Sequence, residues 1–419
     1  MKQRFRKLDH ALCVRAVLEC FDGKWHRNDV KEVVEKYGGV PRWLLERELA
    51  SQDMTLRLEA ADSIACEIEQ RLLDVMEGYA DDLDLEPVVT RPRRDGMTGK
   101  VRDIAQLSIL HQIYGHLLKL GLEPLFRARL LPQQFASIPG KGQTGLKRKL
   151  ERALRSKKLN IRCAIKTDVR HAYGTARYSC VLEILRREIP RARWIIVLTE
   201  QMERMAPDGH LVIGGYIDAW FFNFLMSYAM RYVLSLETVR RGKRTPTVKL
   251  LCSYMDDFGY LGSRMAGLKS AARKLDAWLR ETYGMELKPT GAEIRFISVA
   301  EEHALRRVPH RGAPGLDMGG YVVHRTYTSI RRAIFVRVRR HFLRAALELD
   351  TTGTIPVQRC RRLMSYNGYF KHTNTRKAAK DLRVAELVKV ARRVIGAHCR
   401  MEAVQEERRQ YALFGCSVQ

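Results

Sequence analysis

Three aspartates have the residue type and the setting that metal-assisted chemistry requires. Asp256 and Asp257 are adjacent in TPTVKLLCSYMDDFGYLG, where the flanking apolar runs predict a strand, a turn and a second strand. Neighbouring carboxylates repel each other, which raises the pKa of one of them unless a cation binds. Mg²⁺ prefers carboxylate oxygens and keeps coordination positions open for phosphates. An isolated pair of aspartates at a turn is equally typical of an acidic hairpin tip at a protein surface.

The third aspartate, Asp168, makes chemistry the better interpretation. It ends the predicted strand in IRCAIKTDVRHAY, 88 residues before Asp256. Phosphoryl transfer by two metal ions needs carboxylates from separate strands around the same cations. Tyr173 follows Asp168 by five residues, where its ring would block the 2′-hydroxyl of an incoming ribonucleotide; the alternative is an ordinary core tyrosine. The pattern predicts a site for nucleotidyl transfer.

Helices are predicted around these strands wherever apolar residues recur at spacings of three and four. Residues 8–80 follow that pattern, with a break at KYGGVP. Residues 81–100 lose the periodicity and are predicted to be a linker that runs into a turn at Asp95-Gly96. The helical pattern returns in VRDIAQLSILHQIYGHLLKLGLEPLF, and a loop rich in Pro and Gly follows in LPQQFASIPGKGQTG.

Further along, LKRKLERALRSKK is predicted to be a basic helix and AWFFNFLMSYAMRYVLSL an apolar one. The aromatic run from Trp220 to Phe222 is interpreted as core packing rather than a surface for base stacking. GLKSAARKLDAWLRETYG is an amphipathic helix that Gly284 ends. A short strand in GLDMGGYVVHRTYT and then basic helices follow.

Positive charge is concentrated in two blocks of the chain. The net charge is +28; residues 91–160 contribute +12 and residues 301–419 contribute +14, whereas residues 1–90 carry −6. A charge this large repels itself unless a polyanion lies nearby, and nucleic acid is the usual one. The alternative is a basic but solvated surface. A membrane surface is less consistent, because neither end carries a basic amphipathic anchor.

The nine cysteines favour neither a zinc site nor a disulfide framework, because none forms Cys-x-x-Cys and their spacing is irregular. They are predicted to be buried thiols in a reducing cytosol. The N-terminal residues lack the apolar core of a signal peptide, and no run approaches the 18 apolar residues that suggest a membrane span. We therefore expect a cytoplasmic protein without a membrane partner.

The ordered motifs of the chain resemble those of bacterial reverse transcriptases. Tyr254-Met255-Asp256-Asp257 after an apolar run resembles the active-site turn of that family, and DVRHAY resembles its first catalytic motif. Further segments follow in the family's order. RDGMTGKVRDIAQLSILHQIYGHLL and QQFASIPGKGQTG resemble the fingers, and HLVIGGYIDAWFFNFLMSYAM resembles the P-I-G motif. MELKPTGAE resembles the lysine-bearing motif, LDMGGYVVHR the primer grip and SYNGYFKHTNTRKA the thumb. The resemblance covers roughly residues 90–380. The chain departs from it at Val212, where relatives commonly have Pro, and at Asp218-Ala219, where they have Ser-Gln.

This resemblance implies an α+β fold, a right-hand polymerase with fingers, palm and thumb. Residues 1–90 are expected to form a helical N-terminal extension, and residues 91–160 the fingers. Residues 161–325 are expected to form the palm, with an antiparallel sheet, helices and the catalytic aspartates. Residues 326–419 are expected to form a helical, basic thumb or RNA-binding region.

The resemblance also implies roles for single residues. Asp168, Asp256 and Asp257 are the expected catalytic residues and, with Val169, the ligands of two Mg²⁺ ions, for which Mn²⁺ can substitute. The expected contacts to the incoming dNTP are Lys100, Arg102, Lys141, Tyr173 and Lys288. The expected contacts to template, primer or RNA are Gly140, Gly142, Gly214, Tyr254, Met255, Gly319, Gly320, Arg331, Arg332, Arg337, Arg339 and Arg340, the arginines along one predicted helix. The lysines and Arg102 are also consistent with solvated surface cations, and Gly140 and Gly142 with a plain turn.

The implied activity is RNA-templated DNA synthesis from dNTPs, with a structured RNA as template and a DNA primer or cDNA as partner. No segment resembles a ribonuclease H, integrase or HNH domain, which disfavours a self-sufficient retroelement. SIPGKGQ and DGMTGKVR most resemble the stand-alone defence-associated enzymes, so copying of a dedicated noncoding RNA in antiphage defence is expected. The alternatives are an enzyme of a diversity-generating retroelement or retron, and a catalytically idle RNA-binding protein on a polymerase scaffold.

Overall fold

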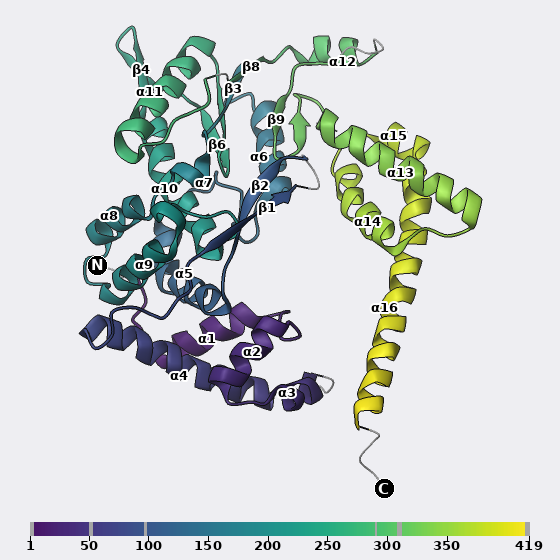
Figure 1. The fold of residues 1–419 in the computed structure, drawn as a ribbon. Coiled ribbons are helices and arrows are strands. Elements are labelled where there is room, and N and C mark those ends of the chain that lie inside the picture. Colours follow the sequence, from purple (N-terminus) through teal and green to yellow (C-terminus); the bar gives the residue numbers. More distant parts are fainter. Residues whose placement is uncertain (1–3, 50–52, 96–98, 290, 308–311, 415–419) are drawn as a thin grey trace. The chain divides into compact units, whose positions relative to one another are not determined.

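A computed structural model gives the fold of the chain (Figure 1). It describes residues 4–49, 53–95, 99–289, 291–307 and 312–414, with side chains up to Met401. The contacts among these residues form two compact units. The first unit comprises Met1–Asp95, Lys100–Gly142 and Cys163–Glu293, and the second comprises Gly96–Gly99, Gln143–Arg162 and Ile294–Gln419. The predicted division into extension, fingers, palm and thumb stays a prediction.

Four helices form the N-terminal part of the first unit (purple to blue in Figure 1). They are α1 (His10–Phe21), α2 (Asn28–Gly38), α3 (Arg42–Leu49) and α4 (Thr55–Glu77). α1 begins where the Asp9 carboxylate accepts a hydrogen bond from the Leu12 backbone N–H at 2.8 Å, which satisfies a free donor of the first turn. α2 ends at the predicted break in KYGGVP, where Gly39 has a φ of 65°. This left-handed conformation is usual for a glycine that closes a helix.

A β-hairpin follows these helices. β1 (Val89–Arg94) pairs antiparallel with β2 (Val101–Gln106). The predicted linker over residues 81–100 is therefore wrong for β1, and the predicted helix over VRDIAQ is wrong for β2. Every residue of β1 is exposed, so the strand lacks the apolar alternation on which a sequence-based strand prediction depends. Gly96 of the predicted Asp95-Gly96 turn lies outside the described residues.

Buried helices carry the core of the first unit. They are α5 (Ile109–Arg129), α7 (Ala172–Thr175), α8 (Tyr178–Glu188), α9 (Arg193–Met205), α10 (Tyr216–Ser235) and α11 (Met265–Tyr283), with a 3₁₀ turn at Pro207–Gly209. α10 is apolar around most of its circumference, which is typical of a helix enclosed on all sides. Phe221 and Phe222 are fully buried, which confirms their predicted place in the core, and Trp220 packs at its margin. Gly284 ends α11 with a φ of 66°, as predicted.

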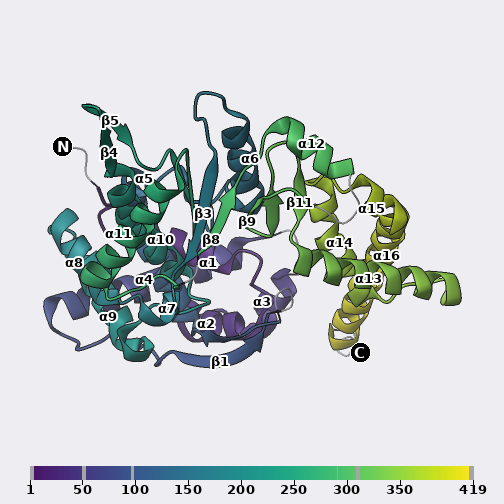
Figure 2. The same ribbon diagram turned by 90° about the horizontal axis from the view of Figure 1, so that it is seen from above.

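A four-stranded sheet with the order β6-β7-β3-β8 lies among these helices. Its strands are β6 (Leu250–Tyr254), β7 (Asp257–Gly262), β3 (Cys163–Asp168) and β8 (Ala292–Arg295). β7 pairs antiparallel with both β6 and β3, which confirms the predicted strand, turn and strand. α10 packs against β6, and α11 packs against β3 and β7. Figure 2 shows α10 and α11 on one side of β3. A separate hairpin joins β4 (Glu237–Arg240) and β5 (Lys243–Pro246).

The second unit has its own core and its own small sheet. β9 (Leu316–Met318), β10 (Tyr321–Val323) and β11 (Thr328–Ile330) form three antiparallel strands where one short strand was predicted. The helices are α6 (Gly142–Arg155, in this unit from Gln143 on), α12 (Val299–Arg307), α13 (Arg332–Thr352), α14 (Val357–Lys371), α15 (Arg376–Asp381) and α16 (Val384–Phe414). α13, α14 and α16 bury Val338, Phe342, Leu363 and Leu387 against one another.

The thiols and helices of the described residues bear on two further expectations. The eight described cysteines are all free thiols, and Cys13, Cys20, Cys163, Cys252 and Cys360 are buried. Cys66 and Cys399 are exposed, so the prediction of buried thiols is wrong for these two. In the part of the chain that the structure describes, no helix has both the length and the apolarity that crossing a membrane takes.

Candidate active site

Strand pairing brings the three aspartates of the sequence together. β3 ends at Asp168 and β7 begins at Asp257, and these two residues are opposite partners in the antiparallel pair. Tyr254 pairs with Asp257 at the end of β6, so Met255 and Asp256 form a two-residue hairpin loop. Met255 has a φ of 54°, because the tight loops that match the twist of a hairpin need left-handed backbone. Asp256 is therefore held at the tip, beside the ends of two strands.

Backbone hydrogen bonds fix the ends of these strands. The Val169 N–H donates to the Asp256 carbonyl at 3.0 Å, and the Lys288 N–H donates to the Asp168 carbonyl at 2.8 Å. Val169 also forms an antiparallel bridge with Leu287. The hairpin tip, the end of β3 and the segment that carries Lys288 are thus tied to one another. These backbone bonds position three carboxylates and a lysine.

Each outer aspartate is paired with a lysine. Lys288 Nζ lies 2.7 Å from Asp168 Oδ2, and Lys166 Nζ lies 3.0 Å from Asp257 Oδ1. Asp256 behaves differently, because burial and then the charges of Asp168 and Asp257 raise its pKa to about 6. The site thus contains one carboxyl whose charged form is destabilised by its surroundings.

The residue types and their burial fit divalent cations. Among the described residues, the buried Oδ1 atom of Asp168 has no hydrogen-bond partner, and such an atom is costly unless something binds it. The donors are carboxylate oxygens, which Mg²⁺ prefers, and a cation would relieve the repulsion that raises the pKa of Asp256. In the described part of the chain, the three aspartates do not bring one oxygen each within 4.8 Å of one another. Lys288 and Lys166 instead each occupy an oxygen.

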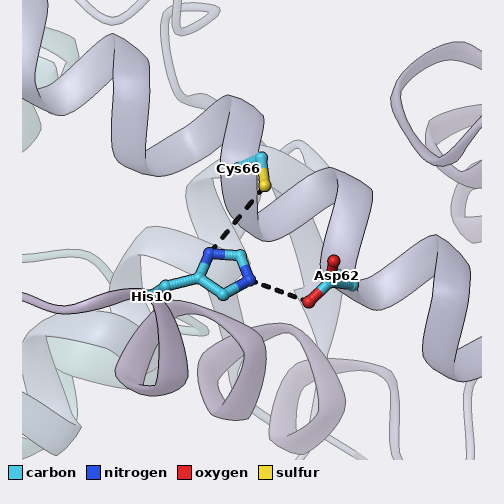
Figure 3. A group of neighbouring side chains, drawn as sticks. All are labelled: His10, Asp62 and Cys66. Carbon is cyan, nitrogen blue, oxygen red and sulfur yellow. Dashed lines mark hydrogen bonds and ion pairs between the residues drawn. The ribbon is translucent and has the colours of Figure 1, made fainter.

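A second cluster of possible metal ligands lies on α1 and α4 (Figure 3). Nε2 of His10 lies 2.8 Å from Asp62 Oδ1, and Nδ1 lies 3.9 Å from Cys66 Sγ. One ring nitrogen of His10 and one ligand atom each of Asp62 and Cys66 lie within 4.8 Å of one another. Hydrogen bonds and charge from Asp62 raise the pKa of His10 despite opposing desolvation. The geometry is that of a hydrogen-bonded ion pair between two helices.

Tyr173, in the short helix α7, packs against α10, and its predicted role as a steric gate stays a prediction. Its ring stacks on Phe222, with 5.2 Å between ring centroids and 21° between planes. Burial, and then the charges of Asp218 and Asp256, raise the pKa of Tyr173, while the charge of Arg102 opposes that rise. Arg102 of β2 is exposed, as is Lys100. The structure thus places Tyr173 within electrostatic reach of Asp256 and of Arg102.

Lys141 and its neighbouring glycines occupy a tight loop. Lys141 Nζ donates to the Leu131 carbonyl at 3.0 Å, and burial lowers the pKa of this lysine. Gly140 and Gly142 have φ values of 74° and 83°, a left-handed region that only glycine enters readily. Residues 133–135 of the same loop bond to β6 next to the hairpin, through Phe135 N–H to the Ser253 carbonyl at 3.1 Å. The described contacts of Lys141 are those of a loop anchor.

Asp218, one of the departures from the family pattern, is buried and holds a loop in place. Its Oδ1 accepts from the Val212 N–H at 2.9 Å and from the Tyr178 hydroxyl at 3.0 Å. Burial raises the pKa of this carboxyl to about 6, and the two hydrogen bonds oppose the rise. Gly214 has a φ of 107° and packs on Ile104 and Ala105 of β2. The loop before α10 therefore lies beside β2. The hydrogen bonds of Asp218 and the positive φ of Gly214 restrict which residues can stand at these two positions.

Sequence reasoning missed three residues of this region. Lys166 lies two positions before Asp168 on β3 and so on the same face of the strand, which is a signal that could have been used. Asn223 donates to the Ala136 carbonyl at 3.0 Å, and Gln134 donates to the Asn223 carbonyl at 2.6 Å. These buried amides connect α10 with the loop beside the hairpin. Their spacing of 89 residues gives no local signal.

The remaining predicted contacts lie in the second unit. Gly319 and Gly320 form the turn between β9 and β10 with φ values of 57° and 83°. The Arg331 N–H donates to the Gly320 carbonyl at 3.0 Å, and Arg331 Nε lies 2.6 Å from Asp317 Oδ1. The other predicted arginines do lie along one helix, α13, where Arg337 is partly buried and Arg332, Arg339 and Arg340 are exposed.

Comparisons with known proteins add little to this geometry. No protein-family profile matches the chain, and no curated protein sequence matches it. Among solved structures, the chain is similar to apo telomerase from Candida tropicalis truncated from its C-terminal domain, with 12% identity and a TM-score of 0.39. That alignment covers 79% of this chain and 84% of the telomerase chain. A TM-score of this size does not establish a common fold.

Proposed function

We propose that the protein is a reverse transcriptase, an RNA-templated DNA polymerase that joins dNTPs to a DNA 3′ end. The observation that carries the proposal is the register of β3 and β7, which sets Asp168 opposite Asp257 with Asp256 at the adjoining hairpin tip. Carboxylates from separate strands around one point are what two-metal phosphoryl transfer requires. The order of the resembling motifs supports the same activity.

In this proposal Asp168 and Asp256 hold two Mg²⁺ ions, with Asp257 as support. The ions, when bound, supply activation of the primer hydroxyl and neutralisation of the triphosphate charge. Mn²⁺ is the expected substitute. With cations held by Asp168, the Lys288 ammonium would pair less fully with that carboxylate and would be available to neutralise the pyrophosphate leaving group. Its contact with Asp168 at 2.7 Å keeps it beside the reaction until then.

Tyr173 selects the sugar of the incoming nucleotide in this proposal. The ring is fixed by stacking on Phe222, so it cannot swing aside without losing that contact. A fixed ring next to the metal-binding carboxylates excludes a 2′-hydroxyl by volume alone. Arg102 and Lys100, both exposed, are proposed to contact the triphosphate oxygens, for which a guanidinium fork is well suited.

Primer extension with the full-length protein tests the activity. An RNA template with an annealed DNA primer, dNTPs and Mg²⁺ should give extended DNA, and EDTA should prevent it. Asp256→Asn should lower the rate by about 10³-fold or more, because charge stabilisation of several kcal/mol is lost and each 1.36 kcal/mol is tenfold. Asp208→Asn is the matched control, since Asp208 is exposed on the turn after α9 and Asn tolerates its φ of 50°.

RNA affinity, measured in parallel, separates loss of chemistry from loss of binding. Asp256→Asn should bind RNA as tightly as the wild-type protein. Extension by Asp256→Asn at the wild-type rate would overturn the mechanism. A wild-type protein that binds RNA but never extends a primer would instead support the idle RNA-binding scaffold.

The biological role is a finer proposal. We propose that the enzyme copies a noncoding RNA encoded beside its gene in bacterial antiphage defence, on the resemblance of SIPGKGQ and DGMTGKVR to the defence-associated group. Sequencing of cDNA that copurifies with the protein from its native host tests this. Reads from one structured noncoding RNA are expected, whereas reads from a variable protein-coding repeat would indicate a diversity-generating retroelement.

A further inference from the structure

Three arginines of α13 share one face of the helix. Arg337, Arg340 and Arg344 follow one another at spacings of three and four residues, which places them above one another along the helix. They line a cavity of about 500 Å³ together with His341 of the same helix and with Arg362, Ser365 and Tyr366 of α14. Sites of 300–1,000 Å³ are typical of small-molecule and cofactor binding. Four arginines, three of them exposed, therefore line one hollow within the second unit.

We infer that this cavity between α13 and α14 binds a triphosphate group, carried by the 5′ end of an RNA or by a free nucleoside triphosphate. The inference goes beyond the proposed polymerase activity and does not depend on the three aspartates. The cavity and all of its lining residues belong to the second unit.

Three of the lining arginines, Arg340, Arg344 and Arg362, have no carboxylate partner among the described residues. No carboxylate of the described residues lines the cavity. Arg359, one turn before Arg362 on α14, shows the contrast, because its Nε lies 2.6 Å from Glu348 Oε2. Like charges gathered in a hollow repel one another and destabilise the fold unless an anion binds there. The arrangement is therefore suited to a ligand with several negative charges.

His341 of α13 lines the same cavity and lies within this positive field. Burial, and then the charges of Arg362, Arg359, Arg344 and Arg337, lower the pKa of its imidazole. Among the described residues, its buried Nδ1 has no hydrogen-bond partner. The ring rests against Tyr366, with 5.4 Å between centroids. His341 thus lies among the arginines that line the cavity, with one buried ring nitrogen unpaired among the described residues.

The concentration of charge favours a triphosphate over the phosphodiester chain. A nucleic-acid backbone carries one negative charge per nucleotide and is usually contacted along a stripe of cations. A 5′-triphosphate carries several charges within three linked phosphates, and guanidinium forks bind phosphate oxygens in pairs. Four guanidiniums around one cavity match the second distribution of charge. Arg332 and Arg339, which lie outside the cavity on the same helix, remain available to a backbone.

Binding of RNAs that differ only at the 5′ end tests the inference. The full-length protein is titrated with one RNA sequence carrying a 3′ fluorophore and a 5′-triphosphate, a 5′-monophosphate or a 5′-hydroxyl. The measurement is made in EDTA, because a site formed by arginines needs no divalent cation whereas the proposed polymerase site does. The triphosphate RNA should bind at least about tenfold more tightly than the hydroxyl RNA, since charged hydrogen bonds are the strong ones.

Two triple variants assign the preference to the cavity. Arg340→Gln combined with Arg344→Gln and Arg362→Gln should bind the triphosphate and hydroxyl RNAs equally. The matched control removes three positive charges from α15 of the same unit, through Arg376→Gln, Lys377→Gln and Lys380→Gln, and these residues do not line the cavity. That control should weaken both RNAs by the same factor and keep the preference. Thermal melts of both variants check that the fold is retained.

Competition with ATP in EDTA distinguishes the two sources of the triphosphate. Displacement of the triphosphate RNA by ATP supports a site that takes free nucleotides, and tight binding without displacement supports recognition of an RNA end. Equal affinity of the wild-type protein for the three RNA ends would overturn the inference. So would a preference that survives the loss of Arg340, Arg344 and Arg362. Because no step requires DNA synthesis, failure here leaves the polymerase proposal untouched.

Discussion

Lys288 bonds to Asp168 twice, through the backbone and through the side chain. Its N–H donates to the Asp168 carbonyl at 2.8 Å, and its Nζ lies 2.7 Å from the Asp168 carboxylate. The backbone bond fixes the lysine beside the end of β3 whatever the side chain does. The ammonium can therefore leave the carboxylate for another anion without a change in the fold.

Lys288→Gln should lower the rate of DNA synthesis and raise the affinity for Mg²⁺. The rate should fall by about 10²-fold or more, the usual loss when a positioned proton donor is removed. The affinity should rise because the ammonium no longer competes with a cation for Asp168. Lys269→Gln is the control, since Lys269 is paired with Glu293 at 2.7 Å and, among the described residues, has no ion pair with the three aspartates. Titration with Mg²⁺ in extension assays measures both effects, and weaker Mg²⁺ binding would contradict this account.

Tyr173→Ala should admit ribonucleotides. Removing the ring leaves a space next to Phe222 that a 2′-hydroxyl can enter, while the aspartates keep their positions on β3 and β7. Single-nucleotide incorporation of dGTP and rGTP by the wild-type and variant proteins measures the selectivity. Tyr173→Phe is the control, because it keeps the stacked ring and should keep the selectivity. Unchanged discrimination in Tyr173→Ala would show that the ring is not the gate.

Asp218 should make the stability of the fold depend on pH. Its folded-state pKa of about 6 is raised above the ordinary value of 3.8. A raised pKa means that the protonated carboxyl is favoured on folding, so this contribution is full below about pH 4 and is lost as the pH rises through 6. A shift of about two units corresponds to roughly 3 kcal/mol.

Chemical denaturation between pH 4 and pH 7.5 tests the contribution of Asp218. Asp218→Asn cannot ionise and keeps an oxygen for the Val212 N–H, so its free energy of unfolding should fall less over this range than that of the wild-type protein. Asp256, whose pKa is also raised to about 6, adds a dependence of the same sign to both proteins. Identical pH profiles for the two proteins would show that Asp218 does not titrate in this range.

RNA binding should depend steeply on salt through the exposed arginines of α13. Phosphate contacts release counterions, so log affinity should fall linearly with log salt, by roughly 0.7 per phosphate on a single strand. Arg332→Gln with Arg339→Gln should weaken binding and flatten the slope by about one unit or more. Arg331→Gln should do less, because Arg331 is already paired with Asp317 at 2.6 Å. If RNA affinity did not depend on salt, the net charge of +28 would have to be interpreted as a solvated surface that does not bind nucleic acid.

The candidate site was predictable from the sequence where its parts are local. The hairpin Tyr254-Met255-Asp256-Asp257 is fixed by two apolar runs and a two-residue loop, all within one short segment. The prediction that Asp168 belongs to the same site required only the assumption that its strand joins the same sheet. Lys166 could also have been predicted, because alternate residues of a strand share a face. β1 and β2 escaped prediction since exposed strands carry no apolar alternation.

Other features depended on contacts that only the folded chain creates. Gln134 and Asn223 meet across 89 residues of sequence, and the burial of Asp218 arises from packing of a distant loop and helix. In the second unit, Arg325 donates to the carbonyls of Leu154 and Ile161 at 3.1 and 2.9 Å, which joins α6 to a sheet more than 150 residues later. Residue type and periodicity were enough to predict the β6–β7 hairpin that carries Asp256 and Asp257 and most of the local strands and helices. Tertiary structure decided which amides and charges are buried and that the α13 and α14 arginines enclose one cavity, because those properties depend on which distant surfaces exclude water together.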